Sequence, residues 1–264
     1  MSATFTFGQT YTVQAGDFLS AIAQRFYCDD SEAAWRKIYD ANRAVIGPDP
    51  TQLQVGMVLV IPPKDGNPLP HSKGDLRAML RALGEFESGK RDGDPEQYRV
   101  ENDYGFIGKY QFGEALLKDL GYYQADPVYN GGGNGVAKNF WKGTWTNQRG
   151  MGSKSAFQNA PAVQEAAILE AFRLNWTRIN DALAAADKSV NDYLGKVMTF
   201  NDQGTDKTVT ITLSGLLAGA HLRGPYGVGK LLLEGIPDRD EFKTSILKYV
   251  DEYGGYAVIP EDLA

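Results

Sequence analysis

The sequence has almost none of the residues on which redox, thiol and metal chemistry depend. Cys28 is the only cysteine, so no disulfide can form within the chain. A catalytic thiol needs a neighbouring base, and only His71 and His221 could supply an imidazole. No cluster with metal-ligand spacing and no phosphate-cradling glycine loop occurs. The sequence therefore predicts no cofactor and no metal.

Long apolar runs and an excess of positive charge are also missing. No segment approaches the roughly 18 consecutive apolar residues of a membrane-spanning helix, so we expect no membrane span. Residues 1–20 lack the basic start and apolar stretch of a signal peptide, which predicts synthesis in the cytoplasm without one. The net charge is −6, whereas a nucleic-acid partner would require a basic face. Nucleic acid is therefore excluded as a partner.

The bulk composition is that of a folded protein with more than one domain. Hydrophobic residues make up 42% of the 264 positions, enough for ordinary cores. Proline and glycine are concentrated just after residue 62. Such density is typical of a linker. We therefore predict a first domain at 1–62, a linker at 63–75 and a second domain at 76–264.

The first domain has the pattern strand, helix, helix, strand. A short β run at 11–13 precedes Gly16 and Asp17, and Asp17 is a natural N-cap for the apolar helix that follows. A second helix carries Trp35 and Ile38 at helical spacing. The apolar run 57–61 predicts a strand that ends at a proline.

The second domain is predicted to be mainly helical. A stripe of Leu76, Met79, Leu80, Leu83 and Phe86 predicts a helix that leads into Glu87. Further helices are expected at 161–186 and from residue 213. Between them, 197–200 and 209–212 predict a β-hairpin across the polar segment 201–206. The expected fold class is α+β: a small βααβ domain, then a mainly α-helical domain with a hairpin.

The first domain resembles a LysM domain over nearly its whole length. The likeness is carried by residues 11–23 (YTVQAGDFLSAIA), 38–42 (IYDAN) and 53–62 (LQVGMVLVIP). The resemblance implies binding of N-acetylglucosamine runs in a shallow groove between two loops. By position, that groove would have Gly16, Asp17 and Phe18 on one side and residues 49–53, including Gln52 and Leu53, on the other.

The second domain is similar to the lysozyme-like domains of lytic transglycosylases and goose-type lysozymes. Three segments carry this likeness: Glu87-Ser88-Gly89, residues 105–112 (GFIGKYQF) and residues 218–224 (AGAHLRG). In the third, His221 and Leu222 stand where the family usually has tyrosine and asparagine. The resemblance implies Glu87 as the catalytic acid. It also implies Gln111 as a residue that lines the sugar cleft. Residue type adds three substrate-binding candidates: Ser88, whose small side chain beside Glu87 lets substrate approach, Tyr110, whose ring could stack on a sugar, and His221, which could contact the sugar or a carboxylate.

The residue pattern is compatible with that chemistry. A glutamate after an apolar helix can be kept protonated by desolvation and can donate to a glycosidic oxygen. Glu85 competes for the role, but on a helix it points about 200° away from Glu87. An inverting hydrolase also needs a second carboxylate. Glu101 and Asp103 are the catalytic candidates for it, with the loop acids at 92 and 94 as alternatives.

These observations lead to one main functional hypothesis and two alternatives. The main one is a peptidoglycan-degrading glycosidase that cleaves the MurNAc–GlcNAc β-1,4 bond, targeted by its LysM domain. Such a protein would act at the cell wall or periplasm, as a phage endolysin after lysis or as an antibacterial effector. An effector would require a secretion or injection apparatus and an immunity protein as partners. The alternatives are a non-catalytic, baseplate-associated binding protein with a degenerate lysozyme-like domain, and a chitinase.

Overall fold

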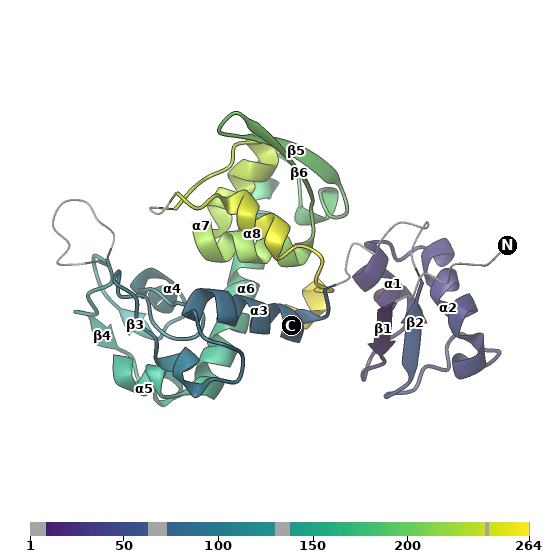
Figure 1. Ribbon diagram of the computed structural model, residues 1–264, viewed down its shortest axis with the longest axis horizontal. Helices are drawn as coiled ribbons and strands as arrows, with labels where there is room; N and C mark the ends of the chain where they lie inside the picture. The colour runs from purple at the N-terminus through teal and green to yellow at the C-terminus, as the bar shows by residue number, and fades with distance from the viewer. Residues whose placement is uncertain (1–8, 63–72, 130–137, 241–242, 264) are drawn as a thin grey trace. The chain divides into compact units, whose positions relative to one another are not determined.

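The computed structural model describes residues 9–62, 73–129, 138–240 and 243–263 (Figure 1). The chain folds as two compact units. The first comprises residues 1–76 and 179–262, and the second comprises residues 77–178 and 263–264.

The N-terminal part of the first unit is a βααβ fold. Its elements are β1 (Gln9–Thr12), α1 (Leu19–Tyr27), α2 (Glu32–Ile46) and β2 (Val58–Ile61), coloured purple in Figure 1. The two strands are antiparallel, with Tyr11 opposite Leu59. The element order is the one that the sequence predicted.

Exposed and buried side chains alternate along β2, so one face of the strand covers the small core. Leu59 and Ile61 are fully buried, while Val58 and Val60 are exposed, as a strand with one covered face requires. Apolar residues one turn apart on the helices, Ile22 and Phe26 on α1 among them, belong to the same core. Burial of each such side chain contributes about 1.5–3 kcal/mol, which is the main source of stability for a domain of this size.

A buried amide fixes α2 to the open edge of β2. Asn42 is 3% exposed and leaves helical geometry, with φ −125° and ψ 16°. Its Nδ2 donates to the carbonyl oxygens of Ile38 (2.7 Å) and Val60 (2.6 Å), and its Oδ1 accepts from the Val60 N–H (2.7 Å). The backbone N–H and C=O of Val60 at this edge are thereby satisfied within the domain.

The start of α1 differs from the prediction. The N-cap residue is Phe18, whose side chain makes no capping hydrogen bond, so the prediction of Asp17 as N-cap is wrong. Asp17 Oδ2 instead accepts from the Tyr11 hydroxyl and the Gln14 N–H, each at 2.7 Å. Gly16, with φ +89°, turns the chain so that this carboxylate closes the preceding turn.

The remainder of the first unit is a hairpin and a helical pair. Its elements are η3 (Val190–Asp192), β5 (Val197–Asp202), β6 (Thr205–Thr210), α7 (Leu213–Glu234), α8 (Ile246–Glu252) and η4 (Pro260–Leu263). The α7 helix has a kink at Gly224 (φ 71°), which is followed by Pro225.

The hairpin is longer than predicted and its turn is shorter. Asp202 pairs with Thr205, so only Gln203 and Gly204 form the turn. Both have positive φ, 57° and 85°, as a tight hairpin turn requires. The predicted loop at 201–206 was therefore wrong, because the polar residues beside the turn continue the strands.

The second unit is mainly helical. Its elements are α3 (Leu76–Ser88, which begins at the unit boundary), η1 (Pro95–Arg99), α4 (Glu114–Asp119), β3 (Tyr123–Gln124), β4 (Thr144–Trp145), η2 (Gln148–Gly150), α5 (Lys154–Gln158) and the start of α6 (Pro161–Ala184). Its core contains edge-to-face aromatic pairs, with the rings of Phe112 and Phe157 5.3 Å apart and those of Tyr122 and Phe157 5.8 Å apart. Met79 and Leu83 of α3 are buried as predicted, but Phe86 is 42% exposed and does not continue the stripe. The α+β class is confirmed.

Candidate functional site

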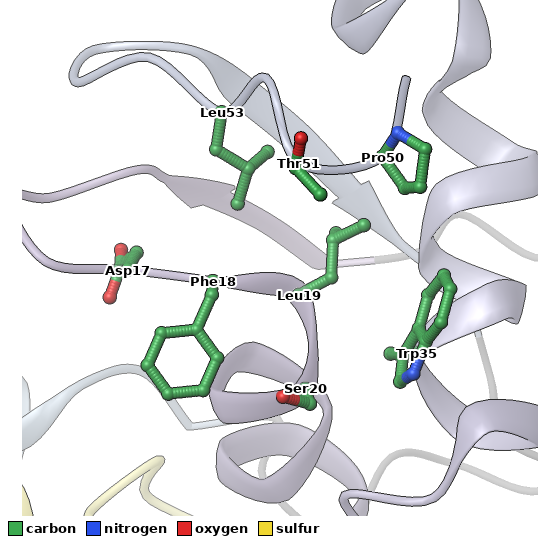
Figure 2. A pocket seen from close by; sticks show the side chains of 8 residues that line it. All are labelled: Asp17, Phe18, Leu19, Ser20, Trp35, Pro50, Thr51 and Leu53. Carbon is green, nitrogen blue, oxygen red and sulfur yellow. The ribbon is translucent and has the colours of Figure 1, made fainter. Parts of the chain in front are cut away.

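A groove of about 320 Å³ lies in the βααβ fold, between the loop before α1 and the loop before β2. Figure 2 shows its lining side chains. They come from three segments: Asp17, Phe18, Leu19 and Ser20; Trp35 of α2; and Pro50, Thr51 and Leu53. In this view Asp17 and Trp35 lie at opposite ends, with Leu19 between them.

Local hydrogen bonds hold both walls in place. On one side Asp17 closes its turn as described above. On the other, Asp49 Oδ1 accepts from the N–H (2.9 Å) and the hydroxyl (2.7 Å) of Thr51. The bond from the Thr51 N–H, followed by that from its hydroxyl, lowers the pKa of Asp49 below its usual value. Both walls are therefore set by contacts within a few residues of chain.

The lining is mostly apolar, with two aromatic rings and a few polar groups. Phe18 is 60% exposed and Trp35 is partly buried against the core of the fold. Exposed rings beside a small number of hydrogen-bonding groups suit a neutral ligand with both apolar and hydroxylated faces.

The structure brings together five of the eight predicted groove residues: Asp17, Phe18, Pro50, Thr51 and Leu53. Gly16 and Gln52 adjoin the walls but do not line this groove, and Gln52 instead donates to Asp49 from its backbone N–H (3.2 Å) and its side chain (3.4 Å). Trp35 was missed because its helical spacing with Ile38 indicated the core. Its position opposite the loop at 50–53 depends on how α2 packs.

The predicted acid, Glu87, lies in the last turn of α3 and is partly buried. Glu85 is exposed, and its Oε1 accepts from the Asp92 N–H at 2.8 Å. Ser88 is 7% exposed, and its hydroxyl donates to the Gly84 carbonyl (2.5 Å) while accepting from the Lys90 N–H (3.1 Å). These bonds give Ser88 a role in ending the helix.

The glycine-rich segment 105–112 forms a closed turn. The N–H and C=O of Ile107 and Phe112 pair with each other at 3.0 and 2.8 Å. Gly108 has φ +78°, and a Cβ there would lie 2.2 Å from Oε1 of Gln164, so only glycine fits. Gln111 is partly exposed and donates to the Gly108 carbonyl (2.9 Å).

Three other predicted residues of this unit, Glu101, Asp103 and Tyr110, lie on or just before the glycine-rich turn. Glu101 is paired with Lys154 at 2.8 Å, and Asp103 is exposed in the turn before Gly105. Tyr110 is fully buried, and its hydroxyl donates to Glu165 at 2.7 Å. It therefore offers no exposed ring face to a sugar, contrary to the prediction of substrate contact.

The third segment, 218–224, belongs to α7 in the other unit. Its Gly219 packs against α8, where a Cβ would lie 3.1 Å from Val250 and 3.2 Å from Ile246. His221 is partly buried on the same helix. The glycine at position 219 is thus explained by close helix packing.

Two further properties concern the described ranges alone. Over them, no helix is both long and apolar enough to cross a bilayer. Nor do three or more histidine, cysteine, aspartate or glutamate side chains in these ranges come together as a metal site would require.

Comparison with protein families identifies this βααβ fold. Residues 11–62 match the model of the LysM domain, so the chain carries an N-terminal LysM domain. A LysM domain implies binding of peptidoglycan or chitin. The rest of the chain has no family assignment, and no catalytic domain is identified. Neither the curated proteins nor the solved structures gave a match.

Proposed function

We propose that the groove bounded by Asp17–Ser20 and Pro50–Leu53 binds a run of N-acetylglucosamine residues of peptidoglycan. The observation that carries this proposal is the exposed ring of Phe18 on a groove whose two walls are held by local hydrogen bonds. A pyranose ring has an apolar face that can cover an aromatic ring. The hydroxyl and amide groups of the sugar can meet the polar groups of the walls.

We further propose that the helical region cleaves the MurNAc–GlcNAc β-1,4 bond, with Glu87 as the general acid. The protonated carboxyl would donate to the leaving glycosidic oxygen. Support comes from the partial burial of Glu87 and from the contact of the turn at 105–112 with the same helix, through Lys109 and Gly84. Glu85 is engaged by the Asp92 N–H on another side. In this proposal the LysM domain raises the local concentration of substrate by tethering.

The substrate locates the proposed activity at the cell wall. A phage endolysin would reach it after lysis of the inner membrane. An antibacterial effector would reach it through a secretion or injection apparatus, and its producer would need an immunity protein.

Digestion of purified sacculi tests the proposal. Wild-type chain, Glu87→Gln and the matched control Glu85→Gln are compared by mass spectrometry of the released muropeptides. We expect cleavage by the wild type and by Glu85→Gln, and loss of at least about 100-fold in Glu87→Gln. Ends that are lighter by one water would indicate a 1,6-anhydro product and a transglycosylase.

The same digestion separates the alternatives. Activity on chitin oligomers but not on sacculi would indicate a chitinase. A chain that pellets with sacculi but releases nothing would be a binding module, and the catalytic proposal would be wrong.

A further inference from the structure

A carboxylate of α6 collects three donors from around the glycine-rich turn. Oε1 of Glu165 accepts from Nζ of Lys109 and from the hydroxyl of Tyr98, each at 2.8 Å. Oε2 accepts from the hydroxyl of Tyr110 at 2.7 Å. Two of these donors, Lys109 and Tyr110, are consecutive residues of the turn, and the third belongs to η1.

The preceding residue of α6 holds the backbone of the same turn. Gln164 is fully buried, and its Oε1 accepts from the Lys109 N–H at 2.9 Å. Its Nε2 donates to the carbonyl oxygens of Tyr98 and Phe157, each at 2.9 Å. Gln164 and Glu165 thus fix the turn through its main chain and its side chains respectively.

The glycine-rich turn at 105–112 also packs against α3, the helix that carries Glu87. The aliphatic part of Lys109 covers Gly84, where a Cβ would lie only 2.3 Å from Cε of the lysine. Gly84 precedes Glu87 by three residues, so the two positions are neighbours on one side of α3. The position of Lys109 therefore determines where the turn lies relative to the predicted acid.

The positive charge of Lys109 makes the position of the turn depend on Glu165. The Lys109 side chain is only 6% exposed, and a buried ammonium is tolerated when it is paired and hydrogen-bonded. The rings of Tyr98 and Tyr110 lie 5.5 and 5.2 Å from Nζ and add cation–π attraction. Without the carboxylate, Lys109 would have to leave this position to regain water, and the turn would move with it.

We propose that Glu165 is a positioning residue for glycan cleavage, which holds the turn at 108–111 in register with Glu87 through Lys109 and Tyr110. This inference rests on the proposed cleavage activity. In this proposal the Glu165 carboxylate does not contact the sugar. Its function is to keep Gln111, the predicted cleft residue, at a fixed place relative to the acid.

The test compares three variants on soluble, uncrosslinked peptidoglycan strands. Glu165→Gln should lower kcat roughly 10- to 100-fold with little change in KM, because a small displacement of a cleft residue impairs the transition state more than ground-state binding. Lys109→Met combined with Glu165→Gln should recover most of the lost kcat, because no uncompensated buried charge remains. Glu170→Gln is the matched control: Glu170 lies on the same helix and binds Tyr122 and Arg149, away from the turn.

Each outcome decides the inference. A Glu165→Gln chain with wild-type kcat would overturn it and leave the proposed cleavage intact. If the double variant were as impaired as the single one and all losses followed the thermal unfolding temperature, the network would only stabilise the fold. That result would also refute positioning. A wild-type chain that releases no product would overturn the cleavage proposal, and this inference with it.

Discussion

Replacing Phe18 should separate the affinity of the LysM groove from the stability of the LysM domain. Phe18 is 60% exposed, and a phenylalanine side chain has roughly 200 Å² of surface, so about 100 Å² of ring is available to a ligand. A sugar that covers half to all of this area removes roughly 50–100 Å² from water, worth about 1–2.5 kcal/mol. We therefore expect Phe18→Ala to weaken binding roughly 5- to 70-fold.

Two variants at position 18 should differ in stability: Phe18→Ala should leave it nearly unchanged, whereas Phe18→Thr should raise it. Phe18 is the N-cap residue of α1 and makes no side-chain capping bond, so truncation to alanine should change stability by less than about 0.5 kcal/mol. Phe18→Thr would supply a hydroxyl that can accept from the first-turn N–H groups. We expect it to stabilise the helix by about 1 kcal/mol while binding sugar as weakly as Phe18→Ala.

Calorimetric titration with a soluble N-acetylglucosamine oligomer measures the first effect. Hydrogen exchange at the Ser20 and Ala21 amides measures the second. Val58→Ala is the control, because Val58 is 54% exposed on β2 and does not line the groove. Folded Phe18→Ala and Phe18→Thr chains with the wild-type Kd would refute the stacking argument.

Two further predictions concern stability. Asn42→Ala removes the three hydrogen bonds of a buried amide and should lower the unfolding free energy by about 2–4 kcal/mol, seen as faster hydrogen exchange at the Val60 amide. Unchanged exchange there would contradict the role of Asn42 at the strand edge. Burial, and after it the nearby charge of Glu165, raises the pKa of Tyr110 above its ordinary value of 10.0. The neutral tyrosine therefore contributes stability that is complete below about pH 10 and is lost as the pH rises further. The unfolding free energy of Tyr110→Phe should therefore fall less steeply than that of the wild type above about pH 10 in denaturant titrations, and equal slopes would contradict this.

The order of elements in the LysM domain could be predicted because it depends on local patterns. The apolar run 57–61, which ends at a proline, predicted β2, and helical spacing predicted α1 and α2. The cap of α1 could not be read in the same way. Asp17 has a side chain suited to an N-cap, but the hydroxyl of Tyr11 and the turn at Gly16 give its carboxylate other partners. The choice between these bonds depends on tertiary contacts.

In the candidate sites too, residues that belong to local sequence patterns could be predicted, and residues placed by tertiary packing could not. The loop residues Asp17, Phe18 and Leu53 could be proposed from the resemblance to LysM, since they come from the two segments that approach each other in a βααβ fold. Trp35 could not, because half-burial and full burial produce the same helical periodicity. Glu165 also escaped prediction, since an isolated glutamate in a helix is usually solvated. Only the packing of α6 against the turn shows its three donors.

The hairpin and the α7 segment show a third limit. The polar residues 201–206 contain two strand ends and a turn, and composition alone does not separate them. The sequence Ala218-Gly219-Ala220 suggested a sugar cleft by analogy, whereas contact with α8 gives Gly219 a packing reason.

The two turns that form the walls of the LysM groove are held by hydrogen bonds within the turns themselves. The bonds to Asp17 and Asp49 that hold the walls all originate between Tyr11 and Thr51. A ligand therefore meets a surface that is already ordered, and little conformational entropy is lost on binding. A recognition surface whose walls depend on so short a stretch of chain can be transferred between proteins, provided that the core contact of Ala257 and the ion pair of Arg25 with Asp262 are replaced. The same groove could thus be combined with catalytic regions of quite different ancestry.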